Sequence, residues 1–219
     1  MTSVLITGAG RGVGAELARQ MGERGDHIIA ATRQGNAQAG AEALKLDVVD
    51  PASITALTET MANRSLDLLV CNAGALIGRG GLDDPAYTFE AFSEVLAVNV
   101  TGVFMTVRAC AAALKRAGGK IAIISSQMGS CERTKGNAYL YRASKAAATN
   151  LACSLAQELK EEGVSVGAYH PGWVRTDMGG ASADISAEES AAGLIQRFDA
   201  LSLESTGCFE FYSGEPIPF

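Results

Sequence analysis

The chain has 219 residues, of which 25 are glycine, with few aromatic side chains and a formal net charge of −6. This length suits one α/β domain with a sizeable core, and the apolar composition excludes a disordered protein. Nucleic-acid-binding proteins carry a concentrated basic face, whereas no basic run here exceeds a residue or two. We therefore expect no nucleic-acid partner.

We expect neither a membrane span nor a secretory leader. A strand-like run, Val4-Leu5-Ile6, begins almost at once, and the longest uncharged apolar stretch, Val95 to Val107, is too short to cross a bilayer. The five cysteines are scattered, odd in number and without metal-ligand spacing. These features predict a cytoplasmic protein with reduced thiols and no metal site.

Strand-like and helix-like segments alternate along the chain, with no repeat, linker or low-complexity tract. This order predicts one domain over 1–219, a Rossmann-type, doubly wound parallel α/β sheet of about seven strands with helices on both faces. Ligands then bind at the carboxyl ends of the strands. The expected strands are 3–7, 26–31, 43–47, 66–71, 119–125, 163–169 and 206–211. The expected helices are 12–24, 51–63, 88–116, 141–162 and 187–199, with an N-cap at Asp50-Pro51 and a capping box at Ser186–Glu189.

The first candidate site is the glycine-rich turn between the first strand and the first helix, Thr7-Gly8-Ala9-Gly10-Arg11-Gly12-Val13-Gly14. Glycine lets the backbone approach a pyrophosphate, and the N-terminus of the helix supplies N–H donors to the anion. The turn therefore predicts a dinucleotide site over 7–14. The alternative is a tight turn that binds nothing.

The end of the second strand indicates which dinucleotide fits. NAD enzymes usually place an acidic residue there for the ribose 2′-hydroxyl, but this chain has Thr32 and Arg33. With Arg11 in the glycine loop, two cations favour a 2′-phosphate, and hence NADP(H) over NAD(H). The alternative is that each arginine is a solvated surface charge.

Two further strand ends are candidates for the cofactor trough. Asp47 and Val48 follow the third strand, where an adenine ring would lie, although Asp47 could instead be a loop acid leading to the helix cap. Asn72-Ala73-Gly74 follows the fourth strand, where small residues and an amide could line the trough and tie strands together. A plain turn is the alternative there.

After the sixth strand, Pro171-Gly172 forces a sharp turn at the edge of the site, and Thr176 could bond a carboxamide. His170, inside the strand end, is expected to be structural. The short segment 178–186, with Gly and Ala, is the candidate for a mobile substrate loop.

Tyr141 and Lys145 lie four residues apart and so share one face of a helix. A free phenol has a pKa of about 10, and a nearby ammonium lowers it. Tyr141 could then transfer a proton near neutral pH. The alternative is an ordinary amphipathic helix, because this spacing is common by chance.

A serine pair and an asparagine complete the set of candidate site residues. Ser125-Ser126 ends the fifth strand, where one hydroxyl could donate to a substrate oxygen or the pair could simply begin a loop. Asn99 lies in an apolar helical stretch, where asparagine is unfavourable unless its amide is satisfied. We expect Asn99 to be buried and hydrogen-bonded.

Together these pieces resemble the short-chain dehydrogenase/reductase family, whose motifs occur in the same order over most of the chain. The matching motifs are Thr7–Gly14, Asp47, Asn72-Ala73-Gly74, Asn99, Ser126, Tyr141 with Lys145, and Pro171-Gly172 with Thr176. The segments 125–130, 141–145, 171–180 and 211–214 further resemble its C-factor and sniffer-like carbonyl reductase branch.

The resemblance implies an NADP(H)-dependent oxidoreductase that reduces a small aldehyde or ketone to an alcohol. It makes Tyr141 the proton donor, with Lys145 lowering its pKa and holding the nicotinamide ribose. Ser126, in the catalytic segment 125–145, would orient the carbonyl, and Asn99 would support a water-linked proton relay. By the same resemblance, Val174 would be one of the cofactor-binding residues.

The resemblance also implies a homodimer or homotetramer paired through helices near 88–116 and 141–162. A function of another class stays open, namely a dinucleotide-binding signalling or regulatory protein of C-factor type with weak or secondary catalysis.

The chain departs from the family pattern in two places. Cys71 stands where the family usually has the first of two asparagines, and we expect this to be tolerated. The interval from Ser126 to Tyr141 is longer than the family's commonest spacing, which leaves open whether Ser125 or Ser126 faces the substrate. We favour Ser126.

Overall fold

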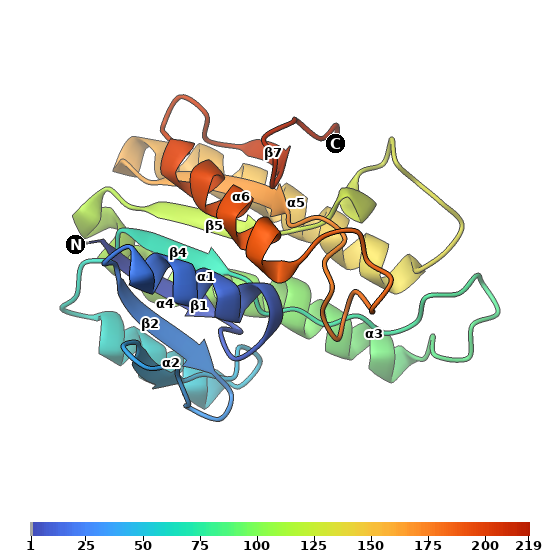
Figure 1. The fold of residues 1–219 in the computed structure, drawn as a ribbon, viewed down its shortest axis with the longest axis horizontal. Coiled ribbons are helices and arrows are strands. Elements are labelled where there is room, and N and C mark those ends of the chain that lie inside the picture. Colours follow the sequence, from blue (N-terminus) through green and yellow to red (C-terminus); the bar gives the residue numbers. More distant parts are fainter. Residues whose placement is uncertain (1) are drawn as a thin grey trace.

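Seven short apolar segments form parallel strands in the computed structural model, which describes residues 2–219 (Figure 1). Their order across the sheet is β3-β2-β1-β4-β5-β6-β7, so the chain reverses its direction of winding between β1 and β4. This doubly wound arrangement confirms the predicted fold class. The strands are β1 (Ser3–Thr7), β2 (His27–Thr32), β3 (Glu42–Lys45), β4 (Leu68–Cys71), β5 (Lys120–Ile124), β6 (Ser165–His170) and β7 (Cys208–Phe211).

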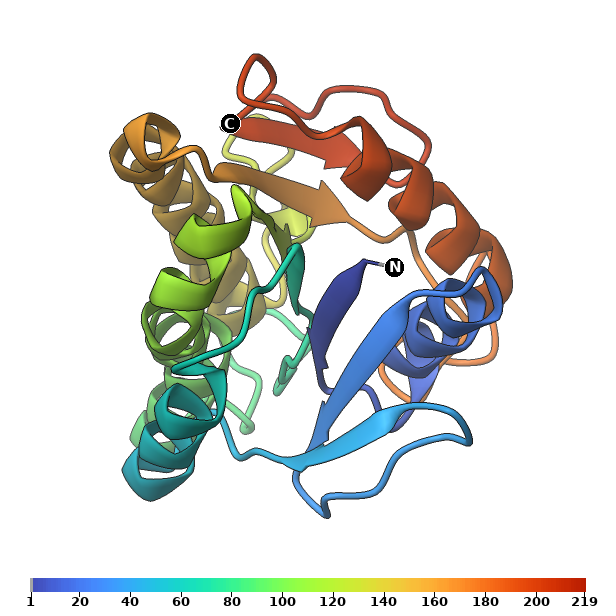
Figure 2. The ribbon, with the colours of Figure 1, turned by 90° about the vertical axis from the view of Figure 1, so that its left-hand side faces the viewer.

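Helices cover both faces of the sheet, since parallel strands need crossovers that return over one face or the other. Figure 2 shows the pair α1 and α6 on one side and α2, α4 and α5 on the other. The helices are α1 (Gly12–Glu23), α2 (Pro51–Met61), α3 (Phe89–Leu96), α4 (Gly102–Ala117), α5 (Tyr139–Leu159) and α6 (Ala187–Ala200).

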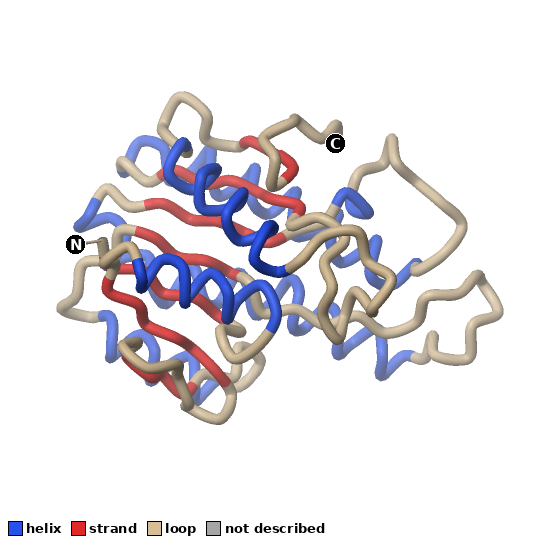
Figure 3. Tube along the Cα trace, viewed as in Figure 1, coloured by secondary structure: helices blue, strands red, loops and turns tan. Residues whose placement is uncertain are grey.

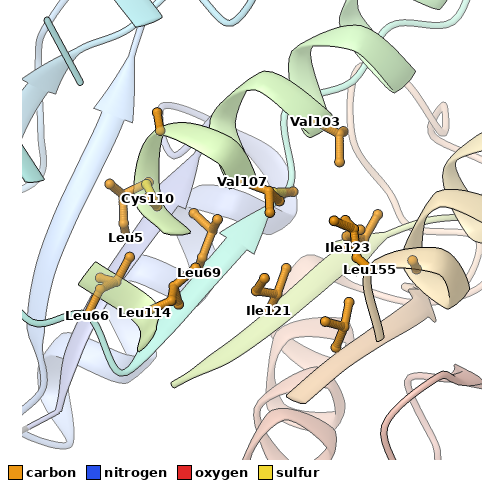
Figure 4. Packing of buried hydrophobic residues seen from close by; sticks show 14 of the residues in the cluster. Leu5, Leu66, Leu69, Val103, Val107, Cys110, Leu114, Ile121, Ile123 and Leu155 are labelled. Atoms are coloured by element: carbon orange, nitrogen blue, oxygen red, sulfur yellow. The ribbon is translucent and has the colours of Figure 1, made fainter. Parts of the chain in front are cut away.

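The main core lies between the central strands and helices α4 and α5 (Figure 4). Val107, Cys110 and Leu114 of α4 are fully or almost fully buried against strand residues such as Leu69 and Ile121. Each fully buried aliphatic side chain of this size stabilises the fold by about 1.5–3 kcal/mol. The helical run Phe89–Ala117 is long and apolar enough to cross a membrane, but its buried face packs on the sheet, as in the core helix of a globular protein.

The expected single helix over 88–116 is divided. A π-helical turn, η1 (Ala97–Thr101), separates α3 from α4. Asn99 lies inside this turn, and Gly102 follows where an added Cβ would come within 2.8 Å of a Val48 methyl. The expected helix over 141–162 is α5, which begins at Tyr139 and ends in a 3₁₀ turn over Lys160–Glu162.

The two predicted caps differ in outcome. Asp50 accepts hydrogen bonds from the N–H groups of Ala52 and Ser53, as an N-cap before proline should. Ser186 accepts from the N–H of Glu189, which is half of the expected capping box. The Glu189 carboxylate accepts from the Tyr212 hydroxyl at 3.3 Å.

Three segments between the regular elements gather at the carboxyl ends of the strands, on the right of Figure 3. They are 72–88 after β4, 130–138 before α5, and 171–186 between β6 and α6. The opposite edge of the sheet has shorter turns. The polar residues singled out by sequence therefore share one edge of the molecule.

Candidate active site

The glycine loop between β1 and α1 has the backbone geometry of an anion cradle. Gly8 and Gly12 have φ of 67° and 57°, in the left-handed region that only glycine adopts at no cost. A Cβ at Gly14 would lie 2.4 Å from Asn72 Nδ2 and 2.5 Å from the Gly8 oxygen. No side chain caps α1 and its first turn holds no acid, so its N–H donors can meet an anion.

Thr7 and Asn72 tie the ends of β1 and β4 together at the switch point. The Thr7 hydroxyl accepts from the N–H groups of Asn72 and Ala73, both at 3.0 Å. In return Asn72 Nδ2 donates to the carbonyls of Thr7 at 3.0 Å and Gly8 at 3.2 Å. These bonds fix the segment after β4 against the start of the glycine loop.

The two arginines at the expected adenosine end differ in their surroundings. Within residues 2–219, Arg33 is exposed and has no ion-pair partner. Arg11 pairs with Asp177 at 2.6 Å, and both side chains are largely exposed. Thr32 is buried, and its hydroxyl bonds Asn36. Arg33 is therefore the cation left without a carboxylate at the end of β2.

Asp47 occupies a turn. Its carboxylate accepts from the N–H of Val49 at 3.1 Å, and its own N–H donates to the Ser53 hydroxyl at 2.9 Å. These contacts match the loop acid that leads to the α2 cap. Val48, next in the chain, packs against Gly102.

Tyr141 and Lys145 occupy the first two turns of α5, and both are at least nine-tenths buried. The Lys145 ammonium lies 5.6 Å from the centre of the Tyr141 ring. It donates to the Ile124 carbonyl at the end of β5, at 2.7 Å. A Cβ at Gly74 would lie 3.8 Å from the same ammonium, so the ends of β4 and β5 meet the helix here.

Burial dominates the electrostatics of this pair. It raises the pKa of Tyr141 to about 12, while the Ser126 hydroxyl and the Arg79 guanidinium act in the lowering direction. Burial also lowers the pKa of Lys145 to about 8. The expected net lowering of the Tyr141 pKa does not occur, because the loss of water outweighs the nearby charges and the Lys145 ammonium is directed to the Ile124 carbonyl.

The two serines after β5 have different environments. The Ser125 hydroxyl lies 2.6 Å from that of Thr149 and donates to the Lys145 carbonyl, so it is committed to α5. The Ser126 hydroxyl oxygen accepts from the Met128 N–H at 3.1 Å, which leaves its proton available. Ser126 is also the serine that acts on the Tyr141 phenol.

Asn99 is 1 % exposed and satisfies its whole side-chain amide. Oδ1 accepts from the Ala75 N–H at 2.8 Å, while Nδ2 donates at 2.9 Å to both the Ala75 carbonyl and the Ser144 hydroxyl. Ser144 in turn donates to the Tyr141 carbonyl at 2.8 Å. The π-helical turn thus joins the segment after β4 to the first turn of α5.

The segment after β6 forms a third side of the candidate site, beside the glycine loop and the start of α5. Gly172 has φ of 88°, and a Cβ there would lie 2.4 Å from Ile185. Val174 bridges to Ile185, and the Thr176 methyl faces the glycine loop, 3.2 Å from where a Gly12 Cβ would be. The Pro171 carbonyl accepts from Ser190 at 2.5 Å. The predicted substrate loop, 178–186, is therefore held near its carboxyl end by the bridge between Val174 and Ile185.

Sequence reasoning missed two residues of this edge. Ser144 lies within the Tyr141–Lys145 motif, so helix geometry could have placed it near Asn99. Arg79 lies in an irregular loop without a motif, and only the three-dimensional structure brings it near Tyr141. No group of three or more His, Cys, Asp or Glu among residues 2–219 could hold a metal ion.

Comparison with known proteins defines the class. The family model described as short chain dehydrogenase matches residues 2–186. A 1-hydroxy-2-glutathionyl-2-methyl-3-butene dehydrogenase of Rhodococcus sp. (strain AD45) is 33 % identical over 227 residues, covering 98 % of both chains. C-signal of Myxococcus xanthus is 35 % identical over 156 residues, covering 70 % of this chain and 93 % of its own. The chain belongs to the short-chain dehydrogenase/reductase family of oxidoreductases.

Solved structures indicate the branch of the family to which the chain belongs. An NADPH-bound carbonyl reductase from chicken fatty liver superposes with a TM-score of 0.89 at 29 % identity, covering 100 % of this chain and 99 % of its own. The carbonyl reductase Sniffer of D. melanogaster superposes with a TM-score of 0.90 at 26 % identity over all of both chains. The chain therefore lies in the carbonyl reductase and C-factor-like branch, as the motifs predicted.

Proposed function

We propose that this protein is an NADP(H)-dependent reductase that converts an aldehyde or ketone to an alcohol. The observation that carries the proposal is the convergence, at one edge of the sheet, of the Tyr141 phenol, the Ser126 hydroxyl that acts on it, and an uncapped glycine loop. The NADPH bound to the chicken carbonyl reductase supports the same cofactor for this chain.

In this proposal NADPH, when bound, supplies the hydride, and the chain supplies position and a proton. Tyr141 is the acid. With a pKa of about 12 it stays protonated at neutral pH and gives up its proton only as negative charge develops on the substrate oxygen. Ser126 donates its free hydroxyl proton to the same oxygen and so orients the carbonyl.

Lys145 and Asn99 support the acid. The pKa of Lys145, about 8, leaves it mainly cationic near pH 7, where its charge stabilises the developing phenolate and its position suits contact with the nicotinamide ribose. Asn99 acts as a positioning residue through Ser144. A water-linked relay through its side-chain amide would use the second lone pair of Oδ1, because both Nδ2 protons are already donated.

In this proposal the cofactor lies across the carboxyl ends of the strands, against the glycine loop. The glycine loop, with Gly8, Gly12, Val13 and Gly14, would hold the pyrophosphate. Arg33 with Thr32 would hold the 2′-phosphate, and Arg11 would join them by leaving Asp177. The remaining contacts we propose come from Asp47, Val48, Asn72, Ala73, Gly74, Pro171, Gly172, Val174 and Thr176.

Oxidation of NADPH, followed in the presence of a panel of aldehydes, ketones and quinones, tests the proposal. We expect turnover of at least one class of carbonyl compound with NADPH, and weaker turnover with NADH. NADPH binding without turnover of any carbonyl would favour the second candidate function, a signalling or regulatory role, which the similarity to C-signal supports.

We also propose a cytoplasmic homodimer or homotetramer. Phe89, Phe92, Leu96 and Phe104 leave apolar side chains exposed along α3 and α4, and a large exposed apolar face on a helix pair suits a second copy of the chain. Light scattering of the wild type and of a Phe104→Glu variant would test this. A monomeric wild type would contradict it.

A further inference from the structure

Arg79 is an exposed cation in the segment 72–88, which follows β4 at the same end of the sheet as the candidate active site. Its backbone N–H donates to Asp84 Oδ2 at 3.0 Å, as does that of Gly80 at 2.7 Å, while Ala86 N–H donates to Asp84 Oδ1. The Tyr87 hydroxyl donates to the Gly80 carbonyl. The residue is therefore presented by an ordered turn, although its side chain is exposed.

The guanidinium reaches across the site. Arg79 Nη2 donates to the Met178 carbonyl in the segment after β6, so it bridges two of the three loops at this edge. Its charge also acts on the Tyr141 phenol in the lowering direction, so the guanidinium lies near the proposed acid. Arg79 is thus close enough to the proposed reaction centre to contact a part of the substrate remote from the carbonyl.

The charge of Arg79 is not neutralised. Among residues 2–219 no carboxylate lies within ion-pair distance of its guanidinium. The neighbouring Asp84 accepts three backbone N–H bonds, and Asp177 pairs with Arg11. A neutral carbonyl, that of Met178, is the hydrogen-bond partner that the side chain has, and a carboxylate would be a better one because both partners are then charged.

The same loops offer apolar surface beside this cation. Leu82 is 81 % exposed, and Trp173 and Met178 are exposed as well. Trp173 Nε1 donates to the Gly179 carbonyl, which holds the indole on the segment that Arg79 contacts. An apolar chain lying on these side chains would bring a terminal anion toward the guanidinium.

On the basis of the proposed reductase function, we propose that the preferred substrates are carbonyl compounds with an apolar body and a terminal carboxylate, and that Arg79 is the residue that selects them by replacing its bond to Met178 with a charge-assisted bond to that carboxylate. Arg79 is a specificity residue in this account. Proton transfer stays with Tyr141.

A series of ω-oxo carboxylic acids of increasing length, each assayed beside its methyl ester, tests the inference. The wild type should have a higher kcat/KM for the acid than for the ester at the length that spans from the carbonyl site to Arg79. Arg79→Met should lower the acid-to-ester ratio roughly tenfold to a hundredfold, the range for losing a charge-assisted hydrogen bond. Arg79→Lys should keep part of the ratio, and raised salt should reduce it in the wild type.

Lys160→Met is the matched control. It removes one positive charge of an exposed residue just beyond the far end of α5, about 30 Å along the helix from Tyr141, and should leave the ratio unchanged. The inference is overturned if the wild type treats acid and ester alike. It is also overturned if Arg79→Met lowers both to the same extent, because Arg79 would then only support its loop.

A binding measurement separates this inference from the reductase proposal. Trp173 is the single tryptophan of the chain, so its fluorescence reports ligands at this edge. If no carbonyl is reduced, the reductase proposal fails. The fluorescence titration then tests carboxylate recognition by itself. Tighter binding of the acid than of the ester, lost in Arg79→Met, supports carboxylate recognition, and equal binding overturns it.

Discussion

At the scale of single residues, we expect one of the two serines after β5 to act in catalysis and the other to stabilise the fold. Ser126→Ala should lower turnover by roughly 10²-fold or more, because it removes the hydroxyl proposed to orient the carbonyl. Ser125→Ala should lower the free energy of unfolding by about 1 kcal/mol through its lost bonds to Thr149 and Lys145, with a smaller effect on turnover. Steady-state kinetics and denaturant unfolding of both variants measure this. A larger loss of turnover in Ser125→Ala would reverse the assignment.

Arg33 is the residue on which the proposed preference for NADP(H) depends. It is exposed at the end of β2 with Thr32 in place of an acid, so its charge is available to a 2′-phosphate. Arg33→Ala should weaken NADPH binding roughly tenfold or more and leave NADH binding nearly unchanged. Fluorescence titrations with both cofactors check this, and equal dissociation constants in the wild type would contradict the preference.

At the scale of elements, α1 depends on a close approach that only glycine permits. Gly14→Ala would place a Cβ 2.4 Å from Asn72 Nδ2 and 2.5 Å from the Gly8 oxygen, so the turn must open. We expect lower thermal stability and weaker NADPH binding, since the loop proposed to hold the pyrophosphate moves.

Gly22→Ala is the control on the same helix. The nearest atom to its added Cβ is 3.7 Å away, in Ile28, and alanine favours a helix over glycine by up to about 1 kcal/mol. This variant should be as stable as the wild type or more stable, with unchanged cofactor binding. If Gly14→Ala behaved like Gly22→Ala, the packing account of the glycine loop would be wrong.

The elements also show which features a sequence can predict. The strands, the helices and the glycine loop follow from local patterns, so their predicted bounds agree closely with the structure. The π-helical turn at Asn99 does not, because it depends on bonds to Ala75 and Ser144, distant in sequence. The raised pKa of Tyr141 and the position of Arg79 likewise depend on burial and on loops that meet only in the folded chain.

At the scale of the whole molecule, His170 links stability to pH. It was expected to be structural, and the structure buries it at the end of β6, edge to face with Phe211. Burial lowers its pKa to about 4, and the charges of Arg133 and Lys145 act in the same direction. Below pH 6.5 the unfolded chain takes up a proton that the folded chain refuses until about pH 4, so acid favours unfolding.

The folded protein should therefore lose about 3 kcal/mol of stability through His170 as the pH falls from about 6.5 to about 4. His170→Phe keeps an aromatic ring beside Phe211 and removes the titration, so its unfolding free energy should depend less on pH over this window. Denaturant unfolding at several pH values compares the two proteins. Parallel curves would show that His170 contributes nothing to acid sensitivity.

The account as a whole depends on Tyr141 as the proton donor, and the Tyr141→Phe variant tests this most directly. The ring and its packing remain, so the fold and the NADPH dissociation constant should stay close to those of the wild type. Turnover should fall by roughly 10²–10⁴, the contribution of a positioned acid. Lys145→Met should lower both turnover and NADPH affinity, because the ammonium serves both.

The deciding measurement is steady-state carbonyl reduction by Tyr141→Phe beside a fluorescence titration of NADPH on the same preparation. The account predicts near-complete loss of turnover with cofactor binding intact. Turnover above about a tenth of the wild-type value, with binding intact, would lie outside the range for losing such an acid and would contradict the proposed mechanism.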